Sequence, residues 1–238
     1  MKLSIVIPAY NEAATIRHIL QKIDRVELIG GIAKEVLVVD DCSTDDTLGA
    51  VHGFKKQNPQ LAILLLQNEK NRGKGFSLAR GIKEATGNFV IVQDADLEYD
   101  PEEYNVLLRP AVYHQADVVY GSRFMGGRPH RILFFWHSIG NRFLTFLSNA
   151  ATNLNLTDME TGFKLFKKDV ISKIKLKETR FGFEPEVTAK ISRVKGIKIF
   201  EVGISYYGRT YQEGKKINWK DGIRAIYCII KYNYFSKN

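Results

Sequence analysis

The sequence predicts a single α/β domain with a mainly parallel central sheet. Short runs of apolar residues alternate with stretches of helical spacing, as in strand–helix–strand units. One run, at residues 89–92, is apolar throughout, which is typical of a strand buried on both faces. Polar residues follow several of these runs directly, and in parallel sheets ligands gather beyond the carboxyl ends of the strands. The 238 residues, 45% of them hydrophobic, suffice for one such domain.

Six strands and the helices between them follow from these patterns. We expect strands at residues 3–7, 35–39, 61–66, 89–92, 116–120 and 198–206. We expect helices at residues 13–26 and 76–85, and a further helix after Asp45 that Ser43 or Thr44 caps. The strand–helix order favours right-handed crossovers, so the polar strand ends should meet at one edge of the sheet.

The strand at residues 89–92 leads into two carboxylates, Asp94 and Asp96, with Ala95 between them. In an extended chain, residues i and i+2 point the same way, so both carboxylates can face one point. Such a pair beside a buried strand is costly unless a cation lies between the charges. Mg²⁺ and Mn²⁺ prefer oxygen ligands and leave positions for substrate phosphates. The alternative is a solvated acidic turn.

Composition narrows the setting of the protein. The formal charge of +9 favours an anionic partner, whether nucleic acid, anionic lipid or a phosphorylated substrate, and does not choose among them. The two cysteines lie far apart and lack metal-site spacing, which favours a reduced, cytoplasmic setting. The first apolar run is too short for a signal peptide, and we expect no segment that spans a bilayer.

Five motifs in order resemble glycosyltransferase family 2, and most of all its dolichyl-phosphate mannose synthase-like branch, which includes polyprenyl-phosphate glycosyltransferases. The motifs are Pro8-Ala9-Tyr10-Asn11-Glu12, Val39-Asp40-Asp41-Cys42-Ser43-Thr44-Asp45, Asn71-Arg72-Gly73-Lys74-Gly75, Asp94-Ala95-Asp96 and Gly121-Ser122-Arg123-Phe124. The resemblance extends from residue 5 to about residue 221. It implies a GT-A type, Rossmann-like nucleotide-binding domain that uses a nucleoside diphosphate sugar and a divalent metal ion.

The resemblance also implies a donor site. Residues at matching positions would contact the nucleoside: Pro8, Tyr10, Glu12, Val39 and Asp41. Asp94 and Asp96 would hold Mg²⁺ or Mn²⁺ beside Ala95, and Glu98 lies where relatives often carry a glutamine that contacts the metal. Arg123, a planar cation at a strand end, fits a role in binding the diphosphate, with a surface salt bridge as the alternative. Arg209 and Lys215 would also bind the diphosphate, because they reproduce an arginine–lysine spacing of the relatives. The glycine-bearing turn at residues 71–75 either cradles phosphates or is a simple loop into a helix.

Two amphipathic stretches favour contact with an acceptor at a membrane surface. The first stripe comprises Ile132, Phe135, Trp136, Ile139, Phe143, Phe146 and Leu147. Its spacing fits either a core helix or a helix at a membrane surface, and the resemblance favours the second. The second stripe comprises Trp219, Ile223, Ile226, Tyr227, Ile230 and Tyr234. From residue 203 onward the chain has seven basic and two acidic residues, which suits an anionic leaflet.

Candidate acceptor residues come from the resemblance as well. His137, Asn141 and Arg142 lie where relatives place groups for the acceptor phosphate. Asp158 and Glu160 belong to a motif similar to the acceptor-side motif of this branch, where they would bind sugar hydroxyls or assist a nucleophile. A capped turn is the alternative for that stretch.

These observations predict an inverting, metal-dependent hexosyltransferase with a polyprenyl or dolichyl phosphate acceptor. The catalytic domain is expected at residues 1–218, and residues 219–238 are expected to form an amphipathic helix on the cytoplasmic face of the membrane. GDP-mannose or UDP-glucose is the expected donor. One alternative is a family 2 enzyme that acts on a sugar hydroxyl. A second is a non-catalytic nucleotide-binding or peripheral membrane protein; no nucleic-acid-binding module is recognisable in the sequence.

Overall fold

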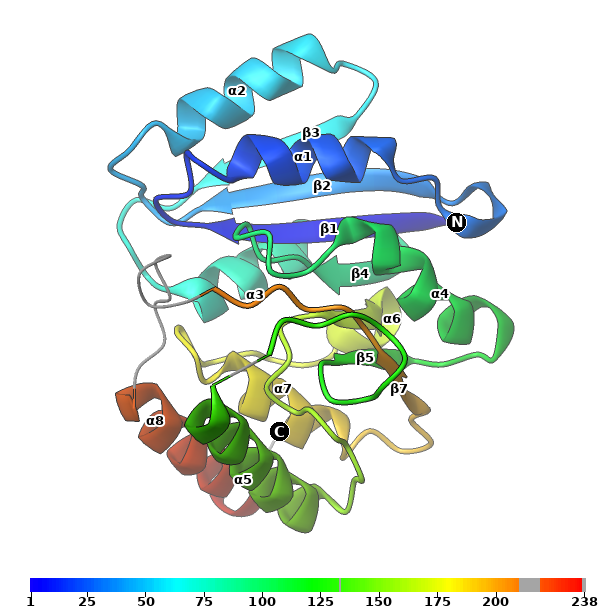
Figure 1. The fold of residues 1–238 in the computed structure, drawn as a ribbon, viewed down its shortest axis with the longest axis vertical. Coiled ribbons are helices and arrows are strands. Elements are labelled where there is room, and N and C mark those ends of the chain that lie inside the picture. Colours follow the sequence, from blue (N-terminus) through cyan, green and yellow to red (C-terminus); the bar gives the residue numbers. More distant parts are fainter. Residues whose placement is uncertain (133, 210–218, 237–238) are drawn as a thin grey trace.

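A seven-stranded sheet forms the centre of the computed structural model, which describes residues 1–132, 134–209 and 219–236 (Figure 1). The strand order in this described part is β3-β2-β1-β4-β6-β5-β7. The strands are β1 (Lys2–Ala9), β2 (Ala33–Asp40), β3 (Ala62–Gln67), β4 (Phe89–Val92), β5 (Val118–Ser122), β6 (Lys164–Lys167) and β7 (Ile199–Gly203). Strands β1 to β4 pair in parallel, as do β5 and β7, whereas β6 is antiparallel to both β4 and β5. The predicted mainly parallel α/β fold is therefore confirmed.

Helices cover both faces of this sheet. The α-helices are α1 (Ile16–Arg25), α2 (Thr47–Gln57), α3 (Lys74–Glu84), α4 (Tyr104–Tyr113), α5 (Phe135–Thr152), α6 (Lys168–Ile171), α7 (Phe183–Ile191) and α8 (Trp219–Ile230). Shorter turns are the 3₁₀ helices η1 (Ile29–Gly31) and η2 (Pro101–Glu103) and the π-helical turn η3 (Lys231–Phe235). In the described part of the chain, no helix is both long enough and apolar enough to cross a membrane.

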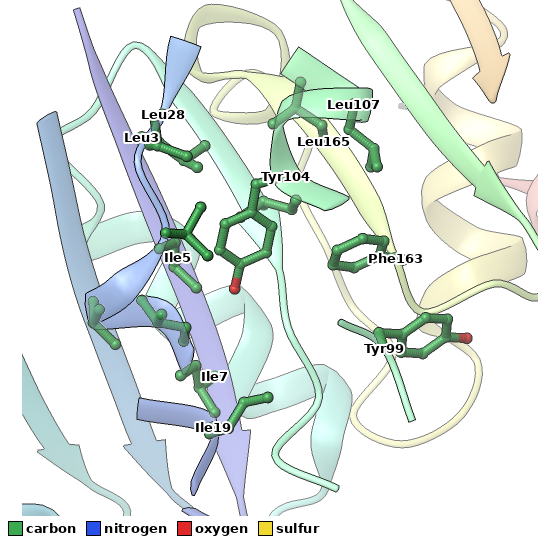
Figure 2. Packing of buried hydrophobic residues seen from close by; sticks show 14 of the residues in the cluster. Leu3, Ile5, Ile7, Ile19, Leu28, Tyr99, Tyr104, Leu107, Phe163 and Leu165 are labelled. Atoms are coloured by element: carbon green, nitrogen blue, oxygen red, sulfur yellow. The ribbon is translucent and has the colours of Figure 1, made fainter. Parts of the chain in front are cut away.

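Two apolar layers follow from the alternation of side chains along the strands. Leu3, Ile5 and Ile7 of β1 pack with α1 and α4 on one face, where Tyr104 and Phe163 lie close by (Figure 2). Val6 points to the other face and packs with residues of α3 and α7. Because successive residues of a strand point to opposite faces, one apolar run supplies both layers.

The sequence located six strands correctly in type and missed β6. Residues 164–167 read Lys-Leu-Phe-Lys, a run too short and too basic at its ends to stand out. Lys164 is nevertheless fully buried, because its ammonium group donates to the carbonyl oxygens of Met159 and Thr161. The expected caps of α2 were wrong: Asp46 is the N-cap, and no side chain makes a capping hydrogen bond. Ser43 and Thr44 instead hydrogen-bond to Asn11 in the loop after β1.

Candidate active site

The polar ends of β1, β2 and β4 meet at one edge of the sheet, as the sequence predicted. These strands are neighbours and run in parallel, so their carboxyl ends lie side by side. The loops after β1 and β2 are joined directly, since the backbone N–H of Asn11 donates to Ser43 and that of Glu12 donates to Thr47. Of the predicted nucleoside-contacting residues at this edge, Tyr10 is exposed and Val39 is fully buried in its strand. Pro8 and Glu12 are half-buried.

Asp41 fastens the glycine-bearing turn to the end of β2. Its carboxylate is buried and accepts hydrogen bonds from the backbone N–H groups of Arg72 (2.9 Å) and Gly73 (2.6 Å). The side chain of Asn68 donates to the same carboxylate at 2.7 Å. Gly73 has a φ of 92°, which L-residues with side chains rarely adopt. Asp41 therefore sets the position of the turn that precedes α3.

Lys74, at the start of α3, joins the first carboxylate of the Asp-Ala-Asp motif to helix α7. Its ammonium group lies 2.9 Å from an oxygen of Asp94 and 3.5 Å from an oxygen of Glu184. Burial lowers the pKa of Lys74, but the attraction of the two carboxylates outweighs burial and raises this pKa above its ordinary value. Lys74 is therefore a fixed cation in the site.

Asp96 and Glu98 share a different cation, the guanidinium group of Arg209. Arg209 donates to Asp96 at 2.8 Å through its side chain and to Glu98 at 2.8 Å through its backbone N–H. Burial raises the pKa of Asp96 to about 7, and the charges of Asp94 and Glu98 act in the same direction while Arg209 opposes them. The hydroxyl of Tyr206 also donates to Glu98, at 2.7 Å.

This donor set fits a hard divalent cation. Asp94 and Glu98 lie near enough to Asp96 at the end of β4 for their charges to raise its pKa, and Ala95 between the two aspartates is buried. Among the described residues, no three carboxylate, histidine or cysteine side chains lie close enough to form a complete metal cluster. A cation at Asp96 would accordingly take its other ligands from the donor and from water, as Mg²⁺ commonly does.

Arg123 is held by Asp158 in a two-point interaction. Its Nε and one terminal nitrogen each donate to the Asp158 carboxylate at 2.7 Å, and Asp158 is fully buried. Burial raises the pKa of Asp158, but Arg123 outweighs burial and holds this pKa below its usual range. The predicted capped turn is present as well, because Glu201 accepts from the backbone N–H groups of Thr157 and Asp158. Asp158 thus orients Arg123 and is not a free base.

Glu160 is partly buried and lies near Lys164, Glu184, Arg123 and Asp158, whose charges all act on its pKa. One of its carboxylate oxygens is buried and accepts no hydrogen bond among the described residues. Burial and the charge of Glu184 raise the pKa of Glu160, whereas burial lowers that of Lys164. Of the two acidic candidates on this stretch, Glu160 is the one with an available oxygen.

The remaining predicted residues lie on α5 or outside the described residues. His137, Asn141 and Arg142 are on α5, where Arg142 is exposed and its guanidinium carbon lies 5.8 Å from the ring centre of Phe124. Lys215 lies outside the described residues. Lys74 was predicted only as part of the glycine-bearing turn, and Glu184 was not predicted. Glu184 lies in the first turn of α7, where the helix dipole accounts for its charge, and its pairing with Lys74 joins positions far apart in the sequence.

Comparison with known proteins decides the family. The model of glycosyl transferase family 2 matches residues 4–175, more than half of the chain. The chain belongs to glycosyl transferase family 2. It is 28% identical over 235 residues to a dolichol-phosphate mannosyltransferase of Pyrococcus furiosus, which covers 98% of this chain. The chain spans 64% of the length of that relative.

Solved structures of two other enzymes share the fold of this family 2 glycosyltransferase. Glucosyl-3-phosphoglycerate synthase from Mycobacterium tuberculosis, in complex with Mn²⁺, UDP and phosphoglyceric acid, superposes with a TM-score of 0.74 at 18% identity. That match covers 100% of this chain and 80% of the other. A mannosyltransferase from Pyrobaculum calidifontis, in complex with GDP-mannose and Mn²⁺, gives a TM-score of 0.63 at 21% identity over 87% of this chain and 56% of the other. The predicted GT-A type fold is confirmed.

Proposed function

We propose that this glycosyltransferase moves a hexose from a nucleoside diphosphate sugar to a polyprenyl phosphate. The observation that carries the proposal is the cluster at the end of β4, where Asp94 and Asp96 adjoin two fixed cations, Lys74 and Arg209. The relative from Pyrococcus furiosus is named for dolichol phosphate, and the two solved enzymes were crystallised with Mn²⁺ and a nucleotide or nucleotide sugar. These likenesses support a divalent metal and a nucleotide-linked donor.

In the proposed reaction, an oxygen of the acceptor phosphate forms a bond to the anomeric carbon as the bond from that carbon to the diphosphate breaks. The configuration at carbon inverts, and the nucleoside diphosphate leaves. Mg²⁺ or Mn²⁺, when bound at Asp96, would supply positive charge for the leaving diphosphate. Arg209 adds positive charge beside Asp96, and Arg123 is oriented by Asp158. Lys215, which the resemblance assigns to the diphosphate, lies outside the described residues.

The state of the acidic side chains supports a phosphate acceptor. A phosphate monoester is largely ionised near pH 7, so its attack needs no general base. Both oxygens of Asp158 are occupied by Arg123, which removes one of the two candidate bases. Transfer to a sugar hydroxyl is the second candidate function, and the available, buried oxygen of Glu160 favours it because a hydroxyl nucleophile requires a base.

A transfer assay separates these candidates. Purified protein is mixed with Mn²⁺ and labelled GDP-mannose or UDP-glucose, and with a polyprenyl phosphate or the matched unphosphorylated polyprenol. We expect a lipid-linked sugar only with the phosphate, and we expect its loss in Asp96→Asn but not in the exposed control Asp46→Asn. Transfer to free saccharides alone would support the hydroxyl-acceptor function. Failure to bind any donor in the presence of Mn²⁺ would support a non-catalytic protein.

We also propose that α5 and α8 contact an anionic membrane surface. The two helices pack against each other (Figure 1). The aromatic stripe of α5 faces outward: Trp136 is 77% exposed, whereas Thr145 and Ser148 form the buried face. Leu147 of the predicted stripe is partly buried and packs against the core, whereas the other residues of the stripe on α5 are exposed. Exposed apolar residues on α8 and the turn after it extend this surface, namely Ile223, Tyr227, Ile230, Tyr234 and Phe235.

Sedimentation with vesicles tests this membrane contact. The basic residues around α8 predict stronger binding to vesicles that contain phosphatidylglycerol than to phosphatidylcholine alone. Replacing Trp136 or Phe146 by glutamate should release the protein, because the charge would enter the headgroup region. Tyr113→Glu is the matched control, since Tyr113 is equally exposed but belongs to α4. Equal release by all three substitutions would contradict the proposal.

A further inference from the structure

A buried carboxylate fixes the C-terminal helix to the body of the protein. Glu178 lies between α6 and α7 and is 5% exposed. Its oxygens accept hydrogen bonds from Arg224 of α8 at 2.6 Å, and from Lys231 (3.0 Å) and Tyr232 (2.7 Å) of η3. Burial would raise the pKa of Glu178, but these donors outweigh it and lower the pKa to about 2.

The backbone beside Glu178 is held from the opposite side by α7. The carboxylate of Glu186, which is fully buried, accepts from the backbone N–H groups of Lys177 at 2.8 Å and Glu178 at 2.7 Å. Lys190, one turn later on α7, pairs with Glu186 at 2.5 Å. The segment at residues 177–180 is therefore clamped between α7 and α8.

Residues 177–180 also contact the glycine-bearing turn of the donor site. The N–H of Phe76 donates to the carbonyl oxygen of Thr179 at 3.1 Å. A Cβ added at Gly73 would lie 2.4 Å from that oxygen, and a Cβ at Gly75 would lie 2.4 Å from the carbonyl oxygen of Glu178. Because the backbone at residues 177–180 packs directly against the turn at Gly73–Gly75, a shift of residues 177–180 must also move the turn.

The turn at Gly73–Gly75 positions charged residues of the donor site. The N–H of Gly73 donates to Asp41 at 2.6 Å, and Lys74 pairs with Asp94 at 2.9 Å. A continuous series of direct contacts therefore connects the face of α8 that carries Arg224 to the first carboxylate of the Asp-Ala-Asp motif.

We propose that Glu178 is a positioning residue for the donor site and acts through the turn at Gly73–Gly75. The proposal rests on the proposed function, because it assumes that this site binds a nucleoside diphosphate sugar. Without the carboxylate, α8 and η3 lose their attachment to residues 177–180, and the turn that carries Lys74 loses its support. The donor should then bind more weakly, although Glu178 itself acts at a distance from the donor.

A matched pair of variants distinguishes positioning from general destabilisation. Glu35 is a second carboxylate whose pKa is lowered to about 2, because hydrogen bonds from Lys2, Ser4 and Thr86 outweigh its burial. Glu35 lies near the start of β2, at the edge of the sheet opposite the donor site. Glu35→Gln and Glu178→Gln make the same chemical change, and both should lower the melting temperature.

Calorimetric titration with Mn²⁺ and either GDP or UDP gives the decisive measurement. We expect Glu178→Gln to raise the Kd of the nucleotide that the wild type binds by about 3- to 30-fold, the range for residues that couple through packed networks. Glu35→Gln should stay within about twofold of the wild type. In the transfer assay, Glu178→Gln should raise the KM for the donor.

The outcomes that contradict the positioning role can be distinguished from those that contradict the proposed function. Wild-type affinity in Glu178→Gln, or an equal loss in Glu35→Gln, would overturn the positioning role while leaving the proposed function intact. No nucleotide binding by the wild type would overturn the proposed function and this inference with it. If Glu178→Gln does not fold, Tyr232→Phe takes its place: it removes one donor to Glu178 and keeps the buried ring, and unchanged donor affinity in that variant would overturn the inference.

Discussion

Replacing Lys74 by methionine removes the cation shared by the partly buried Asp94 and the buried Glu184. Methionine keeps much of the length of the side chain but leaves Asp94 and Glu184 without their common partner. Removing one partner of a buried ion pair costs about 3–5 kcal/mol. The side chains of Lys74 and Asp94 are 20% and 17% exposed, so water can partly compensate and we expect a loss of about 2–3 kcal/mol. For a chain of this size, that loss lowers the melting temperature by about 5–10 °C.

Thermal unfolding of Lys74→Met, with Lys70→Met as control, measures this loss. Lys70 belongs to the same loop but is exposed, and its replacement should change stability by less than about 0.5 kcal/mol. Saturating Mn²⁺ should stabilise Lys74→Met more than the wild type, because the metal no longer competes with the ammonium group for Asp94. Equal melting temperatures for the two variants, or no additional effect of Mn²⁺, would refute the role given to Lys74.

Two further predictions use the same methods. Gly162→Ala would place a Cβ 2.6 Å from a carboxylate oxygen of Asp94. This substitution should lower the free energy of unfolding in urea by about 1–3 kcal/mol and weaken donor binding. The control Gly53→Ala, which adds a methyl group in open space on α2, should be neutral or stabilising. Glu178 has a pKa lowered from 4.5 to about 2, so its stabilisation is present above pH 4.5 and is lost as the pH falls through about 2. The wild type should therefore be about 2 kcal/mol more stable than Glu178→Gln at pH 7, a figure reduced because Arg224 is half-exposed. This difference should fall to near zero at pH 2. A difference that stays constant with pH would contradict the lowered pKa of Glu178.

Much of the fold was predictable because apolar strand runs and helical spacing are local signals. The strand β6 was not, because its burial depends on Lys164, whose ammonium group is satisfied by carbonyl oxygens of the preceding turn. A lysine at the first position of a run indicates a solvent-exposed end unless those acceptors are known. The antiparallel placement of β6 between β4 and β5 is likewise a product of tertiary structure.

The candidate site was predictable in its strand-end carboxylates and less so in their partners. The spacing of Asp94 and Asp96 after a buried strand indicated a cation site without any structure. The pairing of Asp96 with Arg209 joins residues 113 positions apart, and that of Asp41 with the turn at Gly73 joins residues 32 apart. Because the two members of each pair lie far apart in the sequence, their spacing gives no sign that they interact.

Helix α8 shows why an amphipathic pattern alone does not define the role of a helix. Its predicted apolar stripe includes Ile223 and Tyr227, which face outward, whereas its buried face is formed by Ala225, Cys228 and Ile229. The helix thus has two apolar faces, one of them packed against α5 and α7 and the other free for a lipid surface. Because Arg224, on the same helix, is bound to Glu178, the helix that we propose contacts the membrane is also attached to the segment that we propose supports the donor site. If both proposals hold, membrane recruitment and support of the donor site depend on one element.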